Sequence, residues 1–148
     1  FIKFNNGSGC DYLEFLKLKT GKQNDDNPAD NSFQTIANIF GGGEFLKGIS
    51  YGWLDSIKFA INNEVIIFLK QYFDDNEVQQ DFDKRIKLCD LILSFDPVDQ
   101  DAIKLKIKSL SSIDKHHIAK SSYNLFIAEY KRLYDEHFPL SFEEMINS

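Results

Sequence analysis

The sequence predicts an all-α protein of about seven helices joined by short turns. Apolar residues recur at steps of three and four along most of the chain, and residues that form turns separate these segments. The one segment that alternates like a strand has no evident partner strand. With 148 residues, 43% of them hydrophobic, the chain can bury a core of its own. We therefore expect a single helical domain over residues 1–148.

The N-terminal part contains two of the expected helices. Residues 11–19, "DYLEFLKLK", place apolar side chains at helical spacing. Residues 20–31 are rich in Asn, Asp, Gly and Pro and predict a loop. A second helix is expected through "SFQTIANIF", and the glycines at 41–43 would end it.

Two longer helices follow. The first is predicted over residues 52–74, where the apolar stripe consists of Trp53, Ile57, Ile61, Val65, Phe68 and Tyr72. The second is predicted over residues 78–95, with the stripe Val78, Phe82, Ile86, Cys89 and Leu93. Asp96 and Pro97 end it, because proline cannot continue a helix and restricts the residue before it.

Residues 102–110, "AIKLKIKSL", are ambiguous. Apolar residues alternate with lysines, which is typical of a half-buried strand. The preceding "DPVDQD" carries acids suited to the N-terminus of a helix. The residue pattern leaves both alternatives open.

The C-terminal part predicts a helix over residues 118–133 and a short last one. The main stripe of the longer helix is Ala119, Tyr123, Phe126, Tyr130 and Leu133. Ile118, Leu125 and Ile127 lie outside this stripe, so the helix needs neighbours on more than one side. After Pro139, Ser141 and Glu144 in "SFEEMI" have the spacing of a capping box.

The stretch "DFDKRIKLCDLILSFDP" resembles the second helix of a tetratricopeptide repeat. Phe82 stands at the aromatic position, Ile86 and Leu93 at the aliphatic positions, and Asp96-Pro97 at the closing turn. Arg85 departs from the pattern, because a small residue usually packs there between helices.

Residues 11–146 are similar to the bacterial transcriptional activator domain of the streptomycete antibiotic regulatory protein family. The order of "DYLEF", "IFGGGEFLKGISYGWLD", "FDP" and "HHIAKSSYNLFIAEYKRLYDEHFPLSFEEM" carries the resemblance. Its structural signature residues here are Gly48, Trp53, Pro97 and Ala119. The resemblance implies tetratricopeptide-like stacked helical hairpins and a helix at 102–110. In whole regulators such a module follows a winged-helix DNA-binding domain and supports dimerisation or signal transmission.

The glycine-rich stretch "GGGEFLKGISYGWLD" does not fit a nucleotide-binding motif. Leu46 stands where G-x-G-x-x-G needs glycine, and Ile49 stands where a P-loop needs lysine. We expect a structural corner between helices, with Trp53 inserted into the core. The alternative is that Trp53 is exposed and anchors a partner.

No constellation of residues predicts an enzyme, a metal site or a cofactor. His116 and His117 are adjacent and would point about 100° apart on a helix, so they cannot chelate together. The carboxylate pairs, such as Asp25-Asp26, lack the spacing of a calcium loop. Cys10 and Cys89 do not form a disulfide framework and, as unpaired residues, suit a reducing, cytoplasmic compartment; a single bridge between them is the alternative.

Two surfaces are candidates for binding. Lys104, Lys106 and Lys108 form a basic edge, which either solvates a helical hairpin or contacts phosphates beside a DNA-binding domain. Tyr123 and Tyr130 either pack in the core or line a groove that holds a peptide.

The sequence as a whole predicts an interaction module. The net charge of −6 and the pI of about 5.0 argue against direct nucleic-acid binding, and no segment is apolar enough to span a membrane. The chain starts at Phe1 without Met, so we expect residues 1–10 to be the tail of an upstream segment in a larger protein. The expected partner is a second copy or another domain of the parent regulator. The alternative is a peptide-binding helical scaffold unrelated to transcription.

Overall fold

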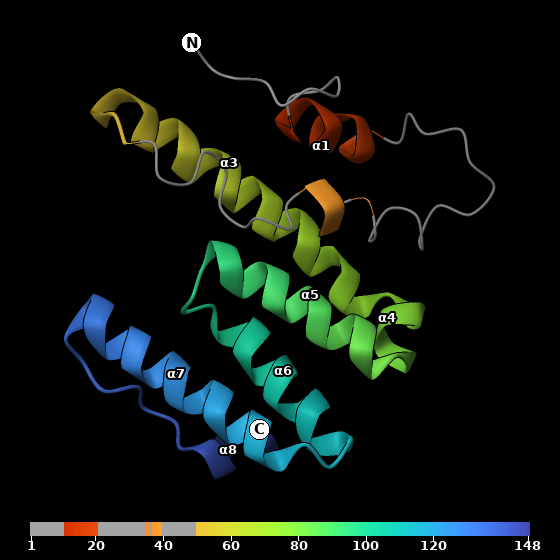
Figure 1. The fold of residues 1–148 in the computed structure, drawn as a ribbon, viewed down its shortest axis with the longest axis vertical. Helices are drawn as coiled ribbons and strands as arrows, with labels where there is room; N and C mark the ends of the chain where they lie inside the picture. The colour runs from red at the N-terminus through yellow and green to blue at the C-terminus, as the bar shows by residue number, and fades with distance from the viewer. Residues whose placement is uncertain (1–10, 21–34, 36, 40–49) are drawn as a thin grey trace. The chain divides into compact units, whose positions relative to one another are not determined.

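The computed structural model describes residues 11–20, 35, 37–39 and 50–148 (Figure 1). Every regular element within these residues is a helix, which confirms the all-α prediction. The chain divides into two compact units, residues 1–68 and 69–148. Some of the sequence predictions fall outside the described residues. They concern most of the helix at 32–40, the glycines at 41–43 and Gly48.

The first unit contains α1 (Asp11–Lys19), as predicted, and most of α3 (Gly52–Lys70), which ends four residues before the end of the helix predicted over 52–74. Phe15 of α1 is fully buried, and its ring meets the ring of Phe68 edge-on, with centroids 5.4 Å apart. Glu64 joins the same two helices. It forms an ion pair with Lys19 and accepts a hydrogen bond of 3.3 Å from the hydroxyl of Tyr12.

The second unit begins with η1 (Gln71–Asp74), a short 3₁₀ helix, followed by α4 (Asn76–Gln80) and α5 (Phe82–Phe95). The single helix predicted over residues 78–95 is therefore broken at Asp81. The carboxylate of Asp81 accepts hydrogen bonds from the backbone N–H groups of Asp83 and Lys84, at 2.9 and 3.0 Å. This N-cap starts a new helix although the apolar stripe continues across it.

Residues 102–110 are helical and belong to α6 (Gln100–Ser112), as the family resemblance implied. Ile103, Ile107 and Leu110 are buried at steps of four and three, which is the spacing of a helix face. The alternating lysines that suggested a strand flank this buried face.

The C-terminal part forms α7 (His116–Tyr134) and α8 (Phe142–Asn147). Asp135 ends α7 in the left-handed conformation, with φ of 54°. The predicted capping box of α8 is present. The N–H of Glu144 donates to Ser141 Oγ at 3.2 Å, and the N–H of Ser141 donates to Glu144 Oε2 at 2.7 Å.

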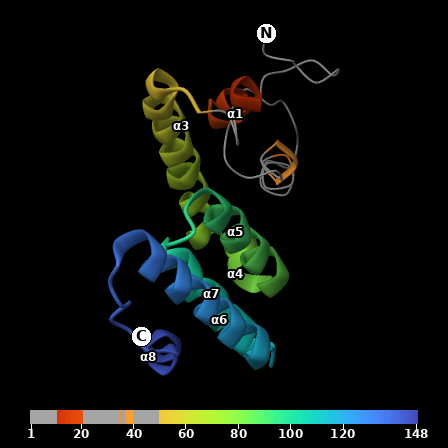
Figure 2. The same cartoon turned by 60° about the vertical axis from the view of Figure 1, so that its left-hand side comes forward.

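The core of the second unit lies where α5, α6 and α7 pack in succession, with α8 against α6 (Figures 1 and 2). Its buried members are Val98, Ile103, Ile107, Leu110, Ala119, Tyr123, Phe126 and Met145. From α4 to α7 each helix packs against a neighbour in sequence, whereas α8 packs back against α6. This arrangement is compatible with stacked hairpins, and the tetratricopeptide-like assignment stays a hypothesis.

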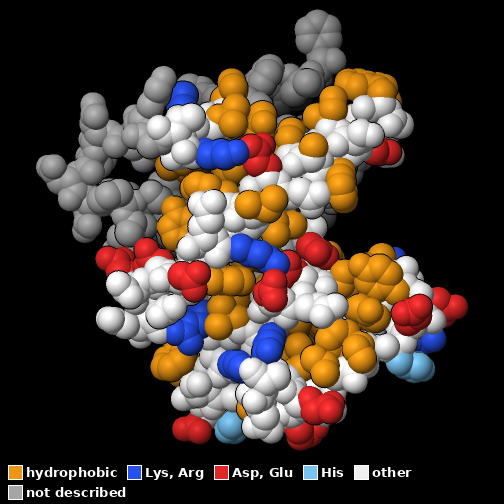
Figure 3. Space-filling model, turned by 180° about the vertical axis from the view of Figure 1, so that it is seen from behind, with side chains coloured by type: hydrophobic (Ala, Val, Ile, Leu, Met, Phe, Trp, Pro, Cys, Tyr) orange, Lys and Arg blue, Asp and Glu red, His pale blue; other side chains and the backbone are white. Residues whose placement is uncertain are grey.

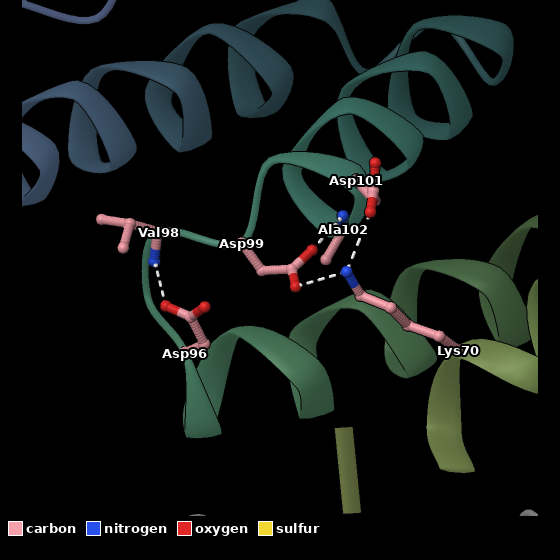
Figure 4. A network of polar contacts seen from close by, with 6 residues as sticks. All are labelled: Lys70, Asp96, Val98, Asp99, Asp101 and Ala102. Carbon is pink, nitrogen blue, oxygen red and sulfur yellow. Dashed lines mark hydrogen bonds and ion pairs between the residues drawn. The ribbon is translucent and has the colours of Figure 1, made fainter. Parts of the chain in front are cut away.

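A polar network fixes the start of α6 (Figure 4). Asp99 caps the helix by accepting a 2.9 Å hydrogen bond from Ala102 N–H, and its other carboxylate oxygen lies 2.6 Å from Lys70 Nζ. Asp101 pairs with the same ammonium at 2.8 Å. Burial by itself would lower the pKa of Lys70, but these two carboxylates raise it. The last residue of α3 is thus held to the first turn of α6.

Candidate protein-interaction surface

A groove of about 300 Å³ opens between the end of α5, α6 and α7. Ile103 and Phe126, both buried, lie at its floor, while Leu93 and Pro97 line it from α5 and the turn after it. Leu125 lines it from α7 and is 71% exposed. An apolar groove of this size, at the lower limit of ligand pockets, suits one or two large apolar side chains.

The groove lies beside an exposed apolar stripe on α7, formed by Ile118, Leu125 and Leu133. These side chains are 39%, 71% and 46% exposed, respectively. Ile118 and Leu125 lie on a face of the helix that is distinct from the buried stripe, whereas Leu133 is the exposed last residue of the stripe that was predicted to be buried. The sequence indicated that this helix needs a neighbour on a second side, and the described residues leave Leu125 largely uncovered.

Paired charges border the groove on both sides. Lys106 Nζ lies 2.6 Å from Asp90 Oδ1. Glu129 accepts two hydrogen bonds from Arg132, of 3.0 and 2.5 Å, and the bond from the guanidinium lowers the pKa of its carboxyl group. Because each charge has a local partner, the groove attracts neither anions nor cations strongly.

The structure places both candidate groove tyrosines in the packing of the second unit. Tyr123 is 9% exposed, and its hydroxyl donates a 2.7 Å hydrogen bond to the carbonyl of Leu140. Part of its ring lines a separate hollow of about 540 Å³ beside Lys131 and His137. Tyr130 is half-buried against Phe138, with ring centroids 5.2 Å apart.

The three lysines of the candidate basic edge are not free to act together. Lys106 is paired with Asp90, and Lys108 Nζ donates to the carbonyl of Ser148 at 2.9 Å. Lys104 is half-buried on the same helix. Two of the three ammonium groups are thus engaged within the protein.

Trp53 does not lie in the core, which corrects the first expectation for this residue. It is 72% exposed in the first turn of α3. The buried side of this helix runs through Ile61 and Val65, and Trp53 lies about 80° or more around the axis from these residues. The exposure of Trp53 agrees with the alternative expectation, and its role as an anchor for a partner stays a prediction.

The other signature residues have structural positions. Ala119 is fully buried in α7, where a small side chain lets a neighbouring helix approach. Pro97 is exposed in the turn between α5 and α6. Arg85, which replaces a small residue, directs its guanidinium to the carbonyl of Gln79 and lies 5.1 Å over the ring of Phe82. The guanidinium therefore contacts α4 and the first residue of its own helix, α5.

Three of the reactive side chains that the sequence analysis considered lie within the described residues. Burial raises the pKa of Cys89 to about 12, so its thiol is neutral and inert. His116 and His117 are exposed. No group of three or more His, Cys, Asp or Glu residues that could hold a metal occurs among the residues that the structure covers. Cys10 and Asp25-Asp26 lie outside them.

A search of the described helices for membrane spans finds none that is both long and apolar enough to cross a bilayer. Comparison with protein-family models, curated proteins and solved structures finds no match for this chain. The resemblance to the bacterial transcriptional activator domain therefore stays a hypothesis that rests on the sequence motifs alone.

Proposed function

We propose that this chain is a non-catalytic interaction module that binds an apolar segment of a partner protein in the groove beside α7. The observation that carries the proposal is Leu125, an aliphatic side chain that is 71% exposed beside an apolar groove. Fully burying a leucine side chain contributes about 1.5–3 kcal/mol, so such a position is costly to leave in water. Anchors of this kind dominate many protein interfaces.

The chemistry of the groove indicates the class of partner. Most of the residues that line it are apolar, and its two charged ones, Lys106 and Glu129, are already paired. A partner segment with one or two large apolar side chains and uncharged flanks would bury them without breaking either ion pair. A strongly charged peptide would gain little here.

The family resemblance supplies a biological setting for this binding. In a regulator of that type, the partner is another domain of the same protein or a second copy, and the module transmits a signal to a DNA-binding part. The alternative is a peptide-binding helical scaffold unrelated to transcription. Sequencing the reading frame upstream of Phe1 separates the two, because a winged-helix domain there favours the regulator and any other domain favours the scaffold.

The binding itself is tested by crosslinking in the host cell. A photo-crosslinking amino acid replaces Leu125 in the chain. The captured protein is then purified, and its affinity for the chain is measured by calorimetry. We expect Leu125→Glu to weaken this affinity at least tenfold, because a carboxylate would be buried in an apolar groove.

Ser121→Glu is the matched control. Ser121 is exposed on the same helix and lines neither hollow, so we expect the affinity to stay unchanged. Thermal unfolding of both variants checks that α7 remains folded. An affinity that is insensitive to Leu125→Glu would rule out the groove as the binding site.

A further inference from the structure

The hollow of about 540 Å³ lies beside the second half of α7 and the segment 135–140 that follows it. His137 and Phe138 line it from this segment. The residues of α7 that line it stand at steps of four in two neighbouring rows, so they share one side of the helix; they are Tyr123, Asn124, Ile127, Ala128 and Lys131. None of these residues lines the groove of the proposed function. We call this site the C-terminal hollow.

Two contacts hold the segment 135–140 against α7. The ring of Phe138 meets the ring of Phe126 edge-on, with centroids 4.9 Å apart. The carbonyl of Leu140 accepts the 2.7 Å hydrogen bond from the hydroxyl of Tyr123. The walls of the C-terminal hollow are therefore in place before a ligand enters, so binding orders few side chains.

The charged side chains that line the hollow are basic. Lys131 and His137 line it, Asn124 adds an amide N–H donor, and no Asp or Glu of the described residues does so. This sign is opposite to the net charge of −6 of the whole chain. Asp135 pairs with Lys131 at 3.3 Å, but its carboxylate is 99% exposed, so solvent weakens the pair. An anion in the hollow can therefore share this ammonium group.

The rest of the lining is apolar and consists of Ile127, Ala128, Phe138 and part of the ring of Tyr123. The negative charges of Glu143 and Glu144 act at the hydroxyl of Tyr123 and, after burial, raise its pKa. An anionic group is repelled from that end. Lys131 stands eight residues further on, about 12 Å along the helix axis. The hollow thus has a basic end and an apolar end.

Figure 3 shows the outer surface of this region from behind. Hydrophobic side chains and a histidine lie together at the end of the second unit where α7 stops, with acidic side chains close by. Asp135 and Glu136 are exposed there and do not line the hollow. The acids therefore border the site and leave its basic end open to an anion.

We propose that the C-terminal hollow binds a small organic acid, a monocarboxylate with an aromatic or branched aliphatic body. The carboxylate lies toward Lys131 and His137, and the body lies against Ile127 and Phe138. The volume of the hollow is within the range of small-molecule sites, about 300–1,000 Å³. This binding is separate from that of a partner protein in the groove and does not depend on it.

The test uses phenylbutyrate as the probe, with phenylbutanol and phenylbutylamine as neutral and cationic analogues of the same body. The full chain, labelled with ¹⁵N, is titrated with each compound up to about 10 mM, and backbone amide shifts are followed by NMR. We expect a dissociation constant of roughly 1 mM for phenylbutyrate. The alcohol should bind about three- to tenfold more weakly, and the amine more weakly still. The shifts should centre on residues 123–131 and 137–138.

The double variant Lys131→Gln and His137→Gln removes both basic groups. It should weaken phenylbutyrate about three- to tenfold and leave phenylbutanol unchanged. The matched control is Lys115→Gln with His117→Gln, because these two residues are exposed at the start of the same helix and line neither hollow. It should bind all three compounds as wild type does.

The variant Ala128→Phe fills the hollow with a larger side chain and should abolish binding of all three compounds. Thermal unfolding checks that each variant is folded. Leu125→Glu, which tests the groove, should leave the titration unchanged.

Three outcomes would overturn the proposal. One is the absence of amide shifts with phenylbutyrate at the highest concentration. Another is equal affinity for the acid, the alcohol and the amine, because the hollow would then be apolar without a preference for anions. The third is a set of shifts centred on the groove or on α3. In each case the crosslinking experiment at position 125 still decides the proposed function separately.

Discussion

At the residue scale, one hydroxyl group links α7 to the segment that leads into α8. Tyr123 donates a 2.7 Å hydrogen bond to the carbonyl of Leu140 while its ring is buried in the core. We expect Tyr123→Phe to lower the free energy of unfolding by about 1–2 kcal/mol, because the ring is kept and the carbonyl loses its donor. Urea denaturation measures the change. Tyr134→Phe, at a ring that is 55% exposed, should change stability by less than about 0.5 kcal/mol.

The same hydroxyl makes stability depend on alkaline pH. Burial, followed by the negative charges of Glu143 and Glu144, raises the pKa of Tyr123 above its usual value of 10.0. A raised folded-state pKa means that the neutral phenol is favoured in the folded protein. This contribution is complete below pH 10 and is lost as the pH rises through the raised pKa. In urea titrations above pH 10, wild type should therefore lose stability more steeply than Tyr123→Phe; equal slopes would contradict this assignment.

Cys89 provides an internal probe of the second unit. Its thiol is fully buried and its pKa is raised to about 12. In a Cys10→Ser background, we expect a thiol reagent to modify Cys89 only through opening of the packing between α5 and α6. Low urea concentrations should accelerate modification in proportion to the population of the open state. Modification of the native protein as fast as that of an unfolded control would contradict the burial of this thiol.

At the element scale, the start of α6 depends on Asp99. Its carboxylate caps the helix and pairs with Lys70, and the side chain is only 7% exposed. We expect Asp99→Ala to cost about 1–3 kcal/mol of unfolding free energy, with loss of the cap as the main part. The contribution of the ion pair is reduced by solvent, because Lys70 is 30% exposed. Chemical denaturation measures the cost.

Asp99→Asn separates these two contributions. The amide oxygen can still cap α6, while the charge that pairs with Lys70 is removed. We expect it to be less destabilising than Asp99→Ala. Asp101→Ala is the control, because Asp101 is 72% exposed and does not cap the helix. A loss of stability at Asp101 as large as that at Asp99 would contradict the role of the cap.

Most helices could be predicted from the apolar period, since burial of one face imposes that period on α1, α3 and α7. The break at Asp81 was missed because the apolar stripe stays in phase across it, and only the Asp side chain marks the new N-terminus. The strand-like alternation in α6 arises because lysines flank its buried face, where their long aliphatic stems can cover apolar surface. Local pattern does not show which neighbours a helix will have.

The candidate surfaces were harder to predict for the same reason. Trp53 was expected in the core because tryptophan is usually well buried. Apolar residues occur around α3 on several sides, and the sequence does not show which side is covered. Leu125 was visible as an apolar residue outside the main stripe of its helix. That it stays exposed beside a groove depends on the positions of α5 and α6, which are tertiary information.

At the scale of the whole molecule, the net charge predicts which class of partner this chain does not bind. The net charge is −6, and two lysines of the candidate basic edge are engaged by Asp90 and by the carbonyl of Ser148. DNA binding requires several cations that are free to replace counterions on the phosphates. Because the net charge is negative and two of these lysines are engaged within the protein, we expect no binding to duplex DNA at an ionic strength of about 0.15 M.

Fluorescence anisotropy of a labelled duplex tests this at protein concentrations up to about 100 µM, where even non-specific binding would be visible. The triple variant Lys104→Glu, Lys106→Glu and Lys108→Glu is the comparison, and it should behave like wild type. Binding by wild type that weakens with salt and disappears in the triple variant would restore the basic edge as a phosphate contact. If wild type does not bind, any contact of this chain with a promoter would have to pass through a partner protein.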